Sequence, residues 1–186
     1  MHARLLFCLL VCALPVPFAS AQTVIAPLRA EIVSPAEITT TAVEAQEGSF
    51  GRIGVPKTGF CAYGFDARGG VKVTDSTGSY GPGEATPDGC FAPDEARPAA
   101  FEILCAKGDT LEMKINARSD IDGVEIETAD VVVEGGKLEQ SGDRFRLTCT
   151  SEDGKAIIKA GTSFTLSPSA KTGDGTLGAL ELDTEY

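Results

Sequence analysis

Apolar residues recur at every second position along much of this chain, and this period constrains the fold more than any other feature. Successive side chains of an extended strand point to opposite faces, so the pattern predicts strands with one buried face. The alternation is clean at Leu111, Met113 and Ile115, whose side chains share one face. Further segments with strand character are 71–73, 101–105, 124–127, 131–133, 145–149, 156–158, 164–166 and 180–182.

Turn-forming residues separate these segments at short intervals. Gly135-Gly136 and Asp153-Gly154 are typical of tight turns. Only 38–46 has any helical character, and that segment is short and rich in threonine. Many short strands punctuated by such turns indicate an all-β protein, and we expect an antiparallel β-sandwich.

The first alternating segment lies at residues 22–33. From Val24 onward its even positions are apolar: Val24, Ala26, Leu28, Ala30 and Ile32. Pro27 cannot donate a hydrogen bond to a neighbouring strand, so this strand should lie at a sheet edge or leave an edge open there. Such a segment could also add to the open sheet edge of a neighbouring molecule.

The N-terminus has the three parts of a secretory signal peptide. Arg4 supplies a positive charge, residues 5–14 form an apolar run, and small residues at 19–21 precede Gln22. This order is typical of a signal that is cleaved between Ala21 and Gln22. The apolar run is shorter than the about 20 residues of a membrane-spanning helix, and no later stretch approaches that length. We therefore expect no membrane span once the signal is removed.

Cleavage of a signal peptide at 1–21 would leave a single β-sandwich domain at 22–186, large enough to bury its own core. This part of the chain contains no histidine and has 27 acidic against 15 basic residues, a net charge of −12. The lack of histidine excludes Ser-His-Asp and Cys-His catalysis and histidine-ligated zinc. The acidity argues against nucleic-acid binding, which needs clustered lysine and arginine.

Four cysteines lie beyond the signal segment: Cys61, Cys90, Cys105 and Cys149. An even number in an exported chain predicts two disulfides, and four cysteines allow three pairings. Cys105 and Cys149 each end an alternating apolar face, which favours a buried bond between them and leaves Cys61 to pair with Cys90. A four-thiolate zinc site is the alternative, but the closely spaced cysteine pairs typical of such sites do not occur.

The segment 75–98 differs from the rest of the chain. It is rich in Gly, Pro, Ser, Thr and Asp and contains Cys90. We expect a long surface loop or an extended hairpin, held by the second disulfide. Long loops often bind partners but can also be merely irregular, and both interpretations remain open.

No motif assigns catalytic, cofactor or metal chemistry to this chain, and we expect no such site. The run 120–123 (Asp-Ile-Asp-Gly) resembles the middle of a calcium loop, but Arg118 and Ala129 occupy the two end positions that need acids. A turn with solvated acids explains the run better. A hydrolase with paired carboxylates is a third, minor hypothesis, because any two of the 27 acids could meet in space.

Four stretches carry a family resemblance: 50–53 (Phe-Gly-Arg-Ile), 99–103 (Ala-Ala-Phe-Glu-Ile), 160–170 and 173–186. The last two lead through a glycine-containing turn into a final alternating strand. Together they resemble a family of exported bacterial β-sandwich proteins of unassigned function, which look pilin-like. The resemblance implies an immunoglobulin-like or pilin-like sandwich in the periplasm or at the cell surface, and it implies no catalytic residues.

These observations favour a non-enzymatic, exported structural or adhesive envelope protein, such as a fimbrial, pilin-like subunit. Its expected partners are further copies of itself or other envelope subunits, joined by strand addition. The alternative is a monomeric periplasmic or secreted ligand-binding or accessory module. No nucleic-acid partner is expected in either case.

Overall fold

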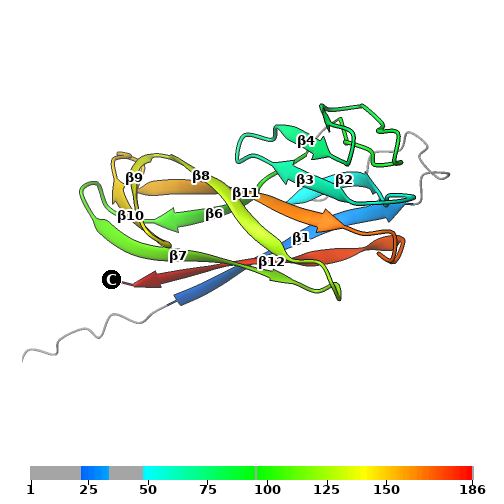
Figure 1. Ribbon diagram of the computed structural model, residues 1–186. Helices are drawn as coiled ribbons and strands as arrows, with labels where there is room; N and C mark the ends of the chain where they lie inside the picture. Colours follow the sequence, from blue (N-terminus) through cyan, green and yellow to red (C-terminus); the bar gives the residue numbers. More distant parts are fainter. Residues whose placement is uncertain (1–21, 34–47, 95, 186) are drawn as a thin grey trace, which may run out of the picture.

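The computed structural model describes residues 22–33, 48–94 and 96–185 (Figure 1). This part of the chain contains twelve strands and no helix, which confirms the all-β prediction. The signal segment with Ala21, the 38–46 segment and Tyr186 lie outside the described residues. The expectations for them therefore stay predictions.

The strands follow one another closely, as the turn residues predict. Their bounds are β1 (Gln22–Val33), β2 (Ser49–Gly54), β3 (Cys61–Phe65), β4 (Val71–Thr74), β5 (Ser79–Tyr80), β6 (Ala99–Leu104), β7 (Thr110–Ser119), β8 (Ile126–Glu134), β9 (Gly136–Ser141), β10 (Arg144–Cys149), β11 (Lys155–Leu166) and β12 (Gly173–Glu185). The longest connection among the described residues runs from β5 to β6 and contains most of the 75–98 segment.

The strands form two sheets (Figure 1). Sheet A has the order β2-β1-β12-β7-β10-β9, and sheet B has the order β5-β4-β3-β11-β6 with β8 also paired to β11. The described neighbours are antiparallel except β1 and β2, which run parallel. Buried side chains of both sheets belong to one apolar cluster, an arrangement that fits a β-sandwich.

Burial along the strands follows the period of two. In β7, Leu111, Met113 and Ile115 are buried while the residues between them are half-buried, as the alternation predicts. Strand β6 alternates strictly between buried and exposed residues. Strand β8 departs from this pattern, because 131–133 (Val-Val-Val) are all half-buried. This departure follows from the position of β8, which pairs with β11 on one side and has no strand partner on the other among the described residues.

The N-terminal strand lies beside the C-terminal strand. β1 pairs antiparallel with β12 from Gln22 to Ile32, and β2 joins its other side only from Arg29 onward. Residues 22–28 therefore have a strand partner on one side only in the described part of the chain. Pro27 falls in this half of β1, in agreement with the expectation that it leaves an open edge.

A β-bulge interrupts the pairing of β1 with β12. The register slips between Leu28 and Arg29, and Leu177 is the extra residue of β12. Gly178 follows the bulge at a point where β12 approaches β7 closely. A Cβ atom at this position would lie 2.0 Å from the carbonyl oxygen of Arg118. Glycine is therefore required here by the approach of two backbones.

We expect Gly178→Ala to lower the free energy of unfolding by about 1–3 kcal/mol, because the new methyl group overpacks the β12–β7 contact. Urea unfolding of the purified protein measures the change. Gly175→Ala is the matched control, since a Cβ there has no heavy atom within 4 Å. Equal losses at the two positions would contradict the close approach as the cause.

Candidate functional site

One disulfide connects the two sheets. Cys105 directly follows β6 of sheet B, and Cys149 ends β10 of sheet A. Their Cα atoms lie 6.3 Å apart. Cys149 is buried as the apolar pattern predicts, whereas Cys105 is half-buried at the end of its strand. The bond is the cross-sheet pairing that the alternating faces favoured.

The second disulfide anchors the 75–98 segment. Cys90 lies within this segment and bonds to Cys61, the first residue of β3, with both side chains fully buried. The segment also has order of its own, because Ala85 and Phe91 form an antiparallel bridge. The segment therefore contains a short local hairpin at 85–91, and the disulfide fixes it to β3.

Asp75 organises the start of the 75–98 segment. Its Oδ1 atom accepts hydrogen bonds from the Thr77 N–H at 2.8 Å, the Thr77 hydroxyl at 2.7 Å and the Gly78 N–H at 3.1 Å. Among the described residues, Oδ2 has no partner that meets the usual geometry of a hydrogen bond. The Thr86 hydroxyl nevertheless stabilises the charged form of the carboxylate. Burial by itself raises the pKa of Asp75, but these donors outweigh it and hold the pKa well below the usual range.

We expect Asp75→Asn to lower the free energy of unfolding at pH 7. The native carboxyl has a lower pKa than the unfolded one, so its stabilisation is present at neutral pH and declines as the pH falls below about 4. Chemical unfolding of wild type and variant between pH 7 and pH 3 should show a difference that narrows toward acid. Asp122→Asn, which changes the same residue type at an exposed turn position, is the matched control.

The side chain of Tyr63 in β3 contacts both β2 and the 75–98 segment. Its ring is buried in the core, where it stacks on Phe164 with 5.4 Å between the ring centroids. The hydroxyl donates to the Gly54 carbonyl at 2.7 Å and accepts from the N–H groups of Gly54 at 2.9 Å and Phe91 at 3.3 Å. Burial raises the pKa of Tyr63 far above its usual value, so the phenol stays protonated. It links β2, β3 and the 75–98 segment.

Tyr63→Phe removes this buried hydroxyl and leaves backbone groups of Gly54 and Phe91 without a partner. We expect a loss of about 1–3 kcal/mol in the free energy of unfolding, measured by urea denaturation. Tyr80→Phe is the matched control, because its hydroxyl bonds to Thr77 at an exposed position. A loss at Tyr80 as large as that at Tyr63 would contradict the anchoring role.

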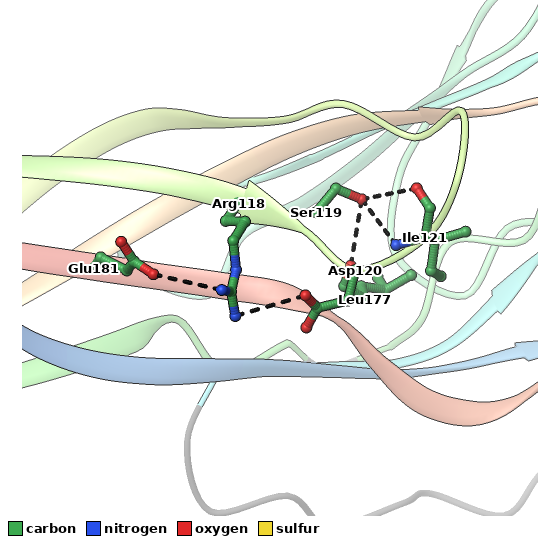
Figure 2. Close-up of polar contacts among 6 residues, drawn as sticks. All are labelled: Arg118, Ser119, Asp120, Ile121, Leu177 and Glu181. Carbon is green, nitrogen blue, oxygen red and sulfur yellow. Dashed lines mark hydrogen bonds and ion pairs between the residues drawn. The ribbon is translucent and has the colours of Figure 1, made fainter.

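Figure 2 shows the turn that leads from β7 of sheet A to β8 of sheet B. The Ser119 hydroxyl accepts from the Ile121 N–H at 3.2 Å and lies 3.1 Å from the Ile121 carbonyl oxygen, to which it can donate. The Asp120 N–H donates to the carbonyl of Leu177, the bulge residue, at 2.8 Å. The bulge in β12 thus holds the start of the turn.

The carboxylate of Asp120 is part of a charge cluster on the outer side of sheet A. Arg118 lies 3.6 Å from Asp120 and 3.9 Å from Glu181 of β12, as the dashed lines in Figure 2 show. Asp122 is exposed. No group of three potential metal ligands occurs among the residues that the structure describes. The run 120–123 is therefore a polar turn whose first acid is already paired.

Two open hollows lie beside β8. One, of about 650 Å³, lies at the outer side of sheet B and is bordered by Phe60, Glu125 and Glu127. The other, of about 660 Å³, lies between β8 and the β9–β10 hairpin and includes Phe145 and Leu138. Phe60 is 40% exposed, more than any other phenylalanine in the described part of the chain. Both hollows are open to solvent.

Sequence reasoning missed Tyr63, Asp75 and the two hollows. The order Asp75-x-Thr77-Gly78 is typical of a turn in which an aspartate bonds to the following backbone, so this signal could have been found. The partners of Tyr63 lie at positions 54 and 91, and no local pattern connects them. The hollows depend on which strands become neighbours.

No protein family model, curated protein or solved structure matches this chain. The described residues include no helix long and apolar enough to cross a membrane.

Proposed function

We propose that this protein is a non-enzymatic, exported structural or adhesive subunit of a bacterial envelope. The observation that carries the proposal is the open edge of β1 at 22–28, in the first strand after the expected signal. An unpaired strand edge offers a row of backbone donors and acceptors to another chain. The two disulfides support the exported location, because such bonds persist in oxidising compartments.

The sandwich belongs, in this proposal, to an immunoglobulin-like or pilin-like type. Its support is the pair of facing sheets and the adjacent first and last strands, β1 and β12 (Figure 1). Because β1 is already paired with β12, addition to a neighbour would use the second edge of residues 22–28 or exchange β1 between copies. Either route joins subunits through backbone hydrogen bonds and so does not require a reaction centre.

The experiment removes a backbone donor from the open edge of β1 and is designed to leave the pairing of β1 with β12 intact. Pro27 stands opposite Ala179, and we expect its nitrogen to face the open edge, because proline within a strand is tolerated where its missing N–H is not needed by a neighbouring strand. Residue 25 has the same orientation, because alternate residues of a strand repeat it. Ile25→Pro should therefore remove a donor from the open edge alone, and Ile25→Ala is the matched control.

We expect wild type and Ile25→Ala to form concentration-dependent oligomers, and Ile25→Pro to remain monomeric. Light scattering coupled to size-exclusion chromatography measures the mass, and electron microscopy detects fibres. Circular dichroism confirms that the proline variant is folded. A wild-type protein that stays monomeric at all concentrations would overturn assembly through this edge.

A second candidate function is a monomeric periplasmic or secreted ligand-binding module. The two hollows beside β8, of about 650 and 660 Å³, favour it, since they are within the range of small-ligand sites. The same light-scattering measurement separates the two candidates, because a binding module would remain monomeric.

A further inference from the structure

Strand β8 has an unoccupied edge that borders a groove. It pairs with β11 along Ile126–Glu134, and no strand pairs with its other side among the described residues. Every second residue of β8 therefore directs its N–H and C=O away from β11. Figure 1 shows β8 crossing from the end of β7 to the start of β9, outside the rest of sheet B.

The groove beside this edge has a mixed lining, in which apolar residues lie alongside Asn116, Glu127, Thr128, Asp130, Gln140 and Asp143. It has a volume of about 660 Å³ and runs between β8 and the β9–β10 hairpin. Its apolar lining residues are Ile115, Ala117, Ile126, Ala129, Val131, Leu138 and Phe145. Val131 stands opposite the buried Ala160 of β11, so it shares the face that points into the sandwich. A strand placed beside β8 would direct alternate side chains into this groove.

The rim of the groove is acidic. Lys and Arg are absent from the linings of both hollows beside β8. Glu127, Asp130 and Asp143 line the groove, whereas Glu125 lines the other hollow together with Glu127. Asp130 accepts a hydrogen bond from the Ala67 N–H at 2.9 Å, and Asp143 pairs with Lys114 at 2.7 Å. Glu125 and Glu127 are exposed and have no such interaction among the described residues.

By strand register Glu127 lies on the opposite face of β8 from Ile126, and it borders both hollows. It is opposite Ser163 of β11, whereas Ile126 is opposite the buried Phe164. A strand added to β8 would therefore meet the apolar residues of the groove with one set of alternate side chains and Glu127 with the other. A partner segment with alternating apolar and basic residues would complement this arrangement.

We propose that the free edge of β8 binds an extended basic segment of another protein by strand addition. Its apolar side chains enter the groove, and its Lys or Arg side chains pair with Glu127 and Glu125. The charge argues against a second copy of this chain as the occupant, because antiparallel pairing of two β8 edges would bring like charges together. This inference goes beyond the proposed function, since it concerns another edge and another partner.

Edge protection is the competing explanation of the same acids. Charged residues and bulges on an edge strand discourage pairing with other chains, and β8 has both. Protection predicts that no extended peptide binds. Strand addition predicts binding that depends on peptide charge and on an intact backbone ladder. The two explanations therefore differ in a measurement on the purified protein.

The probes are three synthetic peptides of 9 residues, the length of β8. The first alternates Leu and Lys, the second alternates Leu and Glu, and the third has the composition of the first with two Leu residues replaced by Pro. Fluorescence anisotropy measures binding, and hydrogen exchange locates it. We expect binding of the Leu-Lys peptide alone, with slower amide exchange confined to β8 and the facing β9–β10 hairpin.

Glu127→Gln should weaken binding of the Leu-Lys peptide by about two- to fivefold, the value of one cross-strand charge pair. Asp153→Asn is the matched control, because it removes one negative charge from an exposed turn and should leave the affinity unchanged. Thermal unfolding confirms that both variants are folded.

Four outcomes would overturn the proposal. The first is that the Leu-Lys peptide does not bind. The second and third are that the Leu-Glu peptide or the proline peptide binds as tightly as the Leu-Lys peptide. The fourth is that the β8 amides exchange more slowly when the protein concentration is raised without any peptide. The last would identify a second copy as the occupant. The first three leave the oligomer measurement on the β1 edge unchanged. The last would give oligomers that Ile25→Pro does not abolish, so the two proposals fail separately.

Discussion

The antiparallel pairing of β1 with β12 connects the two ends of the described chain, and the order of sheet A depends on it. β12 pairs with β7 on one side and with β1 on the other, so it is a central strand instead of an edge. The buried Ala26 and Leu28 of β1 then continue the core face that Leu180 and Leu182 provide on β12. Contacts this distant in sequence require the closure of a long loop, which costs conformational entropy. The two disulfides offset part of such costs, because each limits the unfolded chain.

The same arrangement decides which backbone groups remain available to partners. Strands in the middle of each sheet use both edges internally, whereas residues 22–28 and the outer side of β8 do not in the described part of the chain. The two edges differ in chemistry. The β1 edge includes Pro27, which cannot offer a donor, and the β8 edge lies beside a groove lined by both apolar and acidic residues. They therefore suit different partners.

Local patterns predicted more of the strands than of the surface features. The period of two at 111–115 located a strand and its buried face correctly, because burial of alternate residues depends only on one side of a strand facing a core. The apolar faces ending at Cys105 and Cys149 likewise favoured the observed disulfide. The anchoring role of Tyr63 had no such signal, since its three hydrogen bonds reach backbone at positions far along the chain. The sequence likewise contained no sign that valines 131–133 lie in an edge strand and are only half-buried.

The sequence alone determined that the chain forms many short strands, which of their faces are apolar and which cysteines end those faces. These properties follow from residue type and spacing over a few positions. Only the tertiary structure decided that β1 lies beside β12, that Leu177 forms a bulge and that β8 is left at an edge. The physical reason is that strands pair through backbone N–H and C=O groups, and every residue except proline has both. The local sequence of a strand therefore does not determine which distant strand becomes its neighbour.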